Sequence, residues 1–188
     1  PLIRKQLPKA ELHIYGSYPP PKATALNNPK TGFLIKGWAD NAYEVMQSAR
    51  VCLAPLRFGA GIKGKLLEAM IMQTPSVTTN IGSEGMHNEL PWPGKVANNT
   101  DDFANAAVEL YNNQAGFTHA QQAGNTLLNT LYDKVKLSAA LINKIDSISN
   151  DLKAHREKNF TGQMLKHHTM RSTQYMAQWI AEKNKKLD

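Results

Sequence analysis

Pro55-Leu-Arg-Phe-Gly-Ala-Gly-Ile-Lys-Gly-Lys-Leu-Leu-Glu-Ala-Met70 connects an apolar run to an amphipathic segment. The apolar run Val51-Cys-Leu-Ala54 is typical of a buried strand, and it stops at a proline. Three glycines follow, and then leucines and a methionine recur at helical spacing. A strand that leads through a glycine-rich turn into a helix forms an anion site. Free backbone N–H groups converge there with the positive end of the helix dipole.

Three charged residues sharpen this expectation. Lys63 and Lys65 add two positive charges at the start of the expected helix, and Glu68 lies about one turn further along. Two cations beside free N–H groups favour a phosphate, and a carboxylate accepts hydrogen bonds from hydroxyl groups. The residues therefore predict a phosphate-bearing ligand with a hydroxyl-rich neighbour. They leave open that the glycines only permit a tight turn, and that Lys65 and Glu68 form a surface pair.

The length and composition describe a globular chain. Its 188 residues, 41% of them hydrophobic, can bury a core, and no apolar run is long enough to span a bilayer. The single cysteine, Cys52, excludes an internal disulfide framework and fits a reducing compartment. No signal peptide is recognised. Because the chain opens on Pro1 rather than methionine, we expect a fragment or a processed form.

The net charge of +7 is concentrated near the end of the chain. Residues 151–188 hold eight Lys and Arg against four Asp and Glu. A basic helical segment of this kind meets an anionic membrane surface, an acidic partner or nucleic acid, or is simply a solvated helix face. It contains no recognised nucleic-acid motif, so nucleic acid is not expected as a partner.

Strands and helices alternate through the first two thirds of the chain. This alternation predicts an α/β fold in which a Rossmann-like parallel sheet has helices on both faces. From about Thr118 onward the pattern is helical, with breaks expected near Asn150 and Gly162. The expected strands are residues 11–15, 32–38, 51–55, 75–79 and 95–97.

Residues 1–10 read as the end of a helix that Pro8 terminates. A doubly wound sheet rarely begins with a crossover helix, so we expect its first strand to be missing from this chain. The expected organisation is a Rossmann-like lobe over residues 1–130, incomplete at its N-terminus, followed by basic C-terminal helices over residues 131–188.

Three segments, in order along the chain, resemble one family of proteins. They are Gly59-Ala-Gly-Ile-Lys-Gly-Lys-Leu-Leu-Glu-Ala-Met70, Gln73-Thr-Pro-Ser-Val-Thr-Thr79 and Gly82-Ser-Glu-Gly-Met86. This family is the group 1 retaining glycosyltransferases, which have the GT-B fold. The resemblance is to their C-terminal domain, which binds the nucleotide sugar. Ala10-Glu-Leu-His-Ile-Tyr-Gly16 and Gly32-Phe-Leu-Ile-Lys-Gly-Trp38 are similar to two earlier strands of that domain. The likeness covers roughly residues 1–130.

The resemblance implies a role for each matching position. The glutamate at Glu68 would receive the ribose hydroxyls, the glycine turn would meet the donor diphosphate, and Lys63 and Lys65 would neutralise it. The end of the second strand would pack against the base. The residues expected to contact the donor are Gly59, Ala60, Gly61, Ile62, Lys63, Lys65, Glu68, Ile35, Gly37 and Glu84.

The sequence departs from the family in two ways. Many members carry a first glutamate where this chain has Ala60, so the sugar hydroxyls would be recognised otherwise, for example by Glu84. The family's Gly-Arg-x₄-Lys-type segment, which faces the leaving phosphate, belongs to a strand before Pro1. We therefore expect no catalytic residue in this fragment, and we expect it to be inactive without the N-terminal acceptor-binding domain.

The resemblance also implies the chemistry. Such enzymes move a sugar from a nucleoside-diphosphate donor to an acceptor hydroxyl with retention, here in polysaccharide or glycoconjugate assembly. No Asp-x-Asp motif occurs, and the adjacent His167 and His168 would point to different helix faces, so no metal and no cofactor are expected. The expected location is the cytoplasm or the inner face of the membrane, which the basic helices would contact. The alternative is a non-catalytic nucleotide-binding module.

Overall fold

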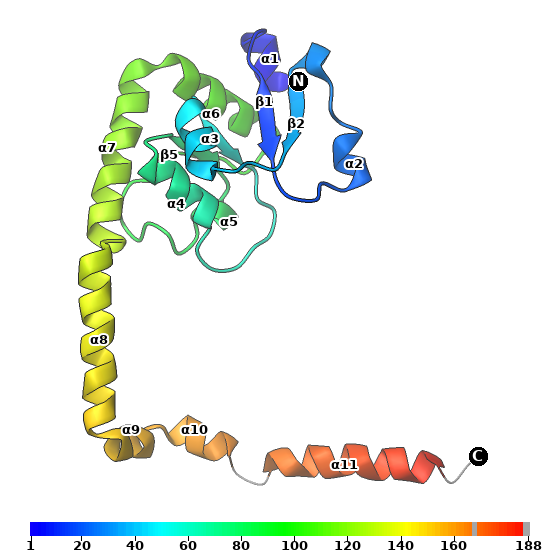
Figure 1. Cartoon of the computed structure of the whole chain (residues 1–188), viewed down its shortest axis with the longest axis vertical. Helices are drawn as coiled ribbons and strands as arrows, with labels where there is room; N and C mark the ends of the chain where they lie inside the picture. The colour runs from blue at the N-terminus through cyan, green and yellow to red at the C-terminus, as the bar shows by residue number, and fades with distance from the viewer. Residues whose placement is uncertain (167–168, 186–188) are drawn as a thin grey trace. The chain divides into compact units, whose positions relative to one another are not determined.

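The computed structural model describes residues 1–166 and 169–185, and the side chains of residues 169 and 170 are not part of that description. The chain divides into two compact units, residues 1–133 and 134–188. The first unit alternates short strands and helices (Figure 1). Its elements are α1 (Leu2–Gln6), β1 (Leu12–Tyr15), α2 (Pro21–Thr24), η1 (Pro29–Thr31), β2 (Phe33–Gly37), α3 (Ala42–Ser48), β3 (Cys52–Ala54), α4 (Gly64–Ile71), β4 (Ser76–Thr78), α5 (Asn80–Ser83), β5 (Gly94–Val96), α6 (Thr100–Asn112) and α7 (Gln114–Leu131).

All the strands of this unit pair in parallel, as the alternating pattern predicts. The sheet, however, is divided into two. β1 pairs with β2, while β3, β4 and β5 form a separate three-stranded sheet in that order. The registers are regular in the larger sheet, where Cys52, Leu53 and Ala54 lie opposite Ser76, Val77 and Thr78. The fold is therefore the expected α/β class with an interrupted sheet.

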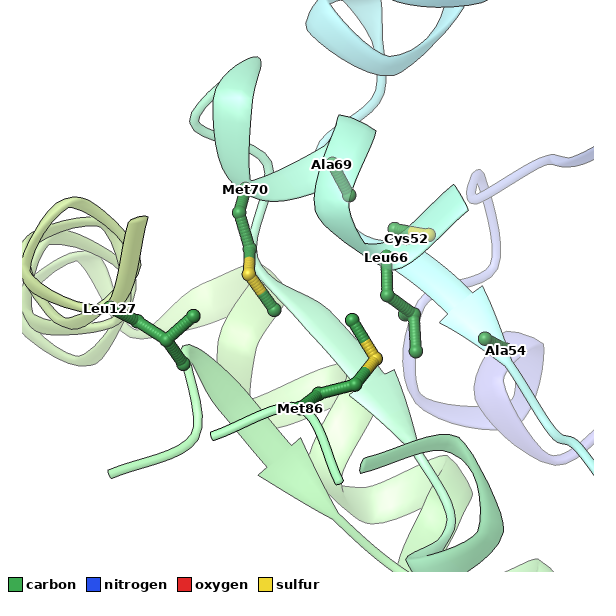
Figure 2. Packing of buried hydrophobic residues seen from close by; sticks show 7 residues of the cluster. All are labelled: Cys52, Ala54, Leu66, Ala69, Met70, Met86 and Leu127. Carbon is green, nitrogen blue, oxygen red and sulfur yellow. The ribbon is translucent and has the colours of Figure 1, made fainter. Parts of the chain in front are cut away.

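Helices cover both faces of the larger sheet. On one face Cys52 and Ala54 of β3 pack with α4, α7 and the loop after α5 (Figure 2). On the other face Val77 of β4 packs with α6 and with Ala120 of α7. Successive strand residues serve opposite faces, as the pleat requires. The first face buries Cys52, Ala54, Leu66, Ala69, Met70, Met86 and Leu127, and the second buries Val77, Ala107, Leu110 and Ala120.

The interruption leaves one edge of β1 and one edge of β3 without a strand partner among the described residues. Leu12 and Gly16 donate their N–H groups toward β2, so the alternation of the strand turns the backbone of His13 and Tyr15 to the opposite edge. Ile14 and Tyr15 stay 38% and 39% exposed. Such exposure is unusual in a parallel sheet, whose strands are normally buried on both faces.

The second unit is entirely helical within residues 134–166 and 169–185. It consists of α8 (Lys134–Asn150), α9 (Leu152–Lys158), α10 (Phe160–Leu165) and α11 (Thr169–Asn184). The break expected near Asn150 is confirmed, and the break expected near Gly162 occurs at Asn159. Gly162 lies inside α10, and the interruption comes three residues earlier because the Asn159 side chain caps α10 by accepting from the Gly162 N–H group at 2.8 Å.

None of the described helices is both long enough and apolar enough to cross a membrane. The expected histidine pair His167 and His168 lies outside the described residues.

Gly82 gives a direct test of the packing around β4. A Cβ atom on Gly82 would overlap Thr78 Oγ1, whose hydroxyl donates to the Ala54 carbonyl at 2.9 Å. We expect Gly82→Ala to lower the free energy of unfolding by about 1–3 kcal/mol, measured by chemical denaturation. The matched control is Gly16→Ala, where a Cβ meets nothing within 4 Å. Equal stability of the two variants would contradict this packing.

Cys52 gives a second test, because it is the chain's one thiol. Burial raises the pKa of Cys52 to about 11, and the Lys65 ammonium only partly opposes the rise. At pH 8 about a thousandth of the thiol is ionised, and the thiolate is the reactive form. We expect Ellman's reagent to modify the native protein at least about 100-fold more slowly than the protein unfolded in guanidinium. Similar rates would show that the β3 core is open.

Candidate donor-binding site

The turn over residues 55–63 connects the end of β3 to the start of α4. Its start is anchored by two hydroxyl groups from the end of the neighbouring strand β4. The Thr79 hydroxyl donates to the Leu56 carbonyl at 2.6 Å, and the Thr78 hydroxyl donates to the Ala54 carbonyl at 2.9 Å. Both threonines lie at the end of β4, so they hold the turn against the neighbouring strand. These two hydroxyls were not predicted as site residues, because only the strand pairing shows which loop they face.

The first turn of α4 presents its backbone N–H groups without a side-chain cap from any described residue. Its N-cap position is Lys63, whereas Asn41, Asn99 and Asn113 cap α3, α6 and α7 with their side chains. An asparagine cap satisfies one or two of the orphan donors of a helix start. At α4 the Leu66 N–H donates to the Lys63 carbonyl at 2.9 Å, and the N–H groups of Gly64 and Lys65 have no hydrogen-bond partner among the described residues. Free N–H groups at a helix start are the arrangement that binds anions.

Glycine shapes the turn before this helix. Gly61 has φ +69°, a left-handed conformation that other residues adopt only with strain. Residues 59 to 62 are all exposed, and a Cβ atom on Gly59, Gly61 or Gly64 would meet nothing within 4 Å. The turn therefore offers its backbone to open space rather than to a tightly packed neighbour.

The two lysines differ in their surroundings. Lys63 is 9% exposed, and its ammonium donates to the Glu84 carbonyl at 3.4 Å, whereas Lys65 is exposed. The turn is thereby brought together with the backbone of Glu84. The Glu84 side chain is exposed and directly follows α5.

Glu68 lies on α4 and is partly exposed. Lys65 and Glu68 are both described, and they form no ion pair with each other. Neither charged group is therefore neutralised by the other, and both side chains are accessible to a ligand.

The last two predicted positions lie elsewhere. Ile35 and Gly37 belong to β2, in the other sheet, where the Ile35 N–H donates to Asn27 Oδ1 at 2.9 Å and the Gly37 carbonyl accepts from the Gly16 N–H at 2.8 Å. No hydrogen bond among the described residues joins them to the turn. The structure therefore gathers residues 59–63 and the Glu84 backbone, with Lys65 and Glu68 on the adjoining helix.

Comparison with known protein families identifies the class of protein to which the chain belongs. The family described as "Glycosyl transferases group 1" matches residues 1–113, more than half of the chain. The chain belongs to the group 1 glycosyltransferases. Comparison with curated protein sequences gives no match.

Solved structures agree on the fold. S. aureus TarM, crystallised as a mutant with fondaparinux, alpha-GlcNAc-glycerol and UDP, matches with a TM-score of 0.65 at 19% identity, over 76% of this chain and 30% of that one. A second TarM structure matches with a TM-score of 0.64 at 19% identity, over the same shares. The pneumococcal O-GlcNAc transferase GtfA, bound to UDP and GlcNAc, matches with a TM-score of 0.52 at 18% identity, over 80% of this chain and 31% of that one. The chain thus spans less than a third of these proteins, and it has the Rossmann-like fold of a GT-B domain.

The conformation of the turn can be tested with two glycines that differ only in backbone geometry. We expect Gly61→Ala to lower the free energy of unfolding by about 1–2 kcal/mol, since alanine is strained at φ +69°. We expect Gly64→Ala, at the first residue of α4, to be neutral or stabilising by up to about 1 kcal/mol. Chemical denaturation of both variants measures the difference, and equal effects would exclude the left-handed turn.

Proposed function

We propose that this chain is the donor-binding, C-terminal lobe of a retaining glycosyltransferase. The full protein would move a hexosyl group from a nucleoside-diphosphate sugar to an acceptor hydroxyl. The observation that carries the proposal is the uncapped start of α4, which follows an exposed glycine turn at the end of β3 in a chain of this family. The UDP found with TarM and with GtfA is consistent with such a donor.

In this proposal the donor diphosphate lies against the turn. The N–H groups of residues 59–62 and of the first turn of α4 would donate to its oxygens, and the exposed Lys65 would supply a full positive charge. Lys63 would hold the turn beside the Glu84 backbone through its ammonium. Glu68 would accept both ribose hydroxyls, because an ionised carboxylate has only acceptor sites. Ile35 and Gly37 would border the base.

The chemistry follows from the charge at this end of α4. The bond between the anomeric carbon and the diphosphate oxygen breaks, and a bond to the acceptor oxygen forms on the same face of the sugar. The acceptor hydroxyl gives its proton to the departing diphosphate. Negative charge develops on the departing diphosphate, where the helix dipole and the lysines stabilise it without a metal ion. The groups that bind and activate the acceptor would come from an N-terminal domain outside these 188 residues, so this fragment by itself would not turn over.

The divided sheet supports a further part of this proposal. A doubly wound sheet in the order 3-2-1-4-5-6 becomes two sheets when strand 1 is removed. The observed orders β2-β1 and β3-β4-β5 are what such a removal leaves. An extended segment from the rest of the polypeptide would pair with the free edges of β1 and β3 and cover Ile14 and Tyr15.

A second candidate is a nucleotide-binding module that does not catalyse. Ala60 favours it, because many family members have a glutamate at that position for the transferred sugar. Full-length protein that binds UDP or GDP but releases no sugar from any nucleotide sugar would support this candidate.

The setting that we propose for the catalytic form is cytoplasmic polysaccharide or glycoconjugate assembly.

Glu68→Gln in the full-length protein tests the ribose role. Loss of charged hydrogen bonds, worth about 1.5–3 kcal/mol, should weaken binding of the cognate nucleoside diphosphate by roughly 10- to 150-fold in calorimetric titration. Inorganic pyrophosphate carries no ribose, so its affinity should not change.

Lys65→Gln is the matched control on the same helix. It should weaken nucleoside diphosphate and pyrophosphate alike, because both place phosphate oxygens at the turn. The assignment fails if Glu68→Gln leaves nucleotide affinity unchanged, or if it weakens pyrophosphate as much as nucleotide.

A further inference from the structure

One face of α11 carries large apolar side chains that remain exposed. Tyr175 and Trp179 are 60% and 58% exposed, and they lie four residues apart on the helix. Met176 and Ile180 repeat the same spacing one position later and are also about half exposed. Residues four apart lie above one another on a helix, so these four side chains form a single stripe. We call Tyr175, Met176, Trp179 and Ile180 the α11 stripe.

The unit that contains this stripe is strongly basic. Residues 134–188 hold eleven of the 22 Lys and Arg but only five of the 15 Asp and Glu, so they carry a net charge of +6 out of the chain's +7. Arg171, Lys183 and Lys185 belong to α11 or directly follow it. The Lys183 ammonium lies 5.1 Å from the centre of the Trp179 ring, which places a cation at the edge of the stripe.

This combination fits the surface of an anionic bilayer. Helices that lie in a membrane interface bury an apolar face beside basic residues, and tryptophan and tyrosine are enriched at that depth. Each Lys or Arg near an anionic leaflet contributes about 1 kcal/mol of attraction. A second copy of the chain fits less well. Four partly covered side chains supply little of the roughly 800 Å² that each partner buries in a stable interface, and like charges would face each other.

We propose that α11 lies on an anionic membrane surface, with the α11 stripe at the acyl boundary and its cations among the lipid headgroups. The apolar contact and the electrostatic attraction act together, because neither alone holds a chain firmly at a membrane. The surface acts independently of the donor site, so its failure would leave the proposed transferase function standing.

The test is co-sedimentation of the 188-residue chain with large unilamellar vesicles. We expect binding to vesicles of 30% phosphatidylglycerol in phosphatidylcholine, little binding to pure phosphatidylcholine, and release from the anionic vesicles as salt is raised. The double variant Tyr175→Ser with Trp179→Ser should partition at least about tenfold more weakly, because two large apolar groups no longer leave water.

The matched control is Gln174→Ser with Gln178→Ser, which alters two exposed residues at the same spacing on another face of α11. It should bind anionic vesicles like the unmodified chain, and circular dichroism should show the same helix content in both double variants. Three results would overturn the proposal. They are equal binding to neutral and anionic vesicles, equal loss in both double variants, and no vesicle binding together with a concentration-dependent dimer that the stripe variant abolishes.

Discussion

The packing of α4 against the larger sheet governs the placement of the site. Leu66 and Ala69 are fully buried and Met70 nearly so, and together they seat the helix on β3 beside Met86 and Leu127. With the helix seated in this way, its N-terminus must emerge at the end of β3, where the turn begins. The packing of α4 therefore determines three features of the candidate site. They are the direction of the helix dipole, the exposure of the turn and the face of the helix on which Glu68 lies. The anion binding that we propose for this helix start would thus be a consequence of apolar burial one helical turn away.

Much of this could be predicted from the sequence, because it is local. The glycine spacing identified the turn, and helical periodicity identified the buried face of α4. Each of the five predicted strands appears in the structure. The first four are shorter than predicted, and the fifth begins and ends one residue earlier. The burial of Lys63 beside an exposed Lys65 could not be predicted. It depends on the Glu84 backbone, 21 residues away, and on a loop whose path is set by the burial of Met86.

The division of the sheet also lay beyond local reasoning. Residues that pair in a parallel sheet are distant in sequence, and a strand pattern does not reveal its partner. The exact position of the helix break at Asn159 was missed for the opposite reason, because a very local hydrogen bond sets it. An asparagine side chain competed for the backbone within three residues and ended α9 earlier than the glycine suggested.

Tyr132 connects the loop after α5, which contacts the candidate site, to the end of the first unit. Its hydroxyl donates to the Met86 carbonyl at 2.9 Å, two residues after the Glu84 carbonyl that receives the Lys63 ammonium. Partial burial raises the pKa of this tyrosine, so the hydroxyl keeps its proton and its donor role at neutral pH. The loop after α5 is therefore held at two nearby points, by Lys63 from the turn and by Tyr132 from the end of α7. The end of the first unit is thus part of the framework that fixes the shape of the turn, although 46 residues separate Tyr132 from Met86.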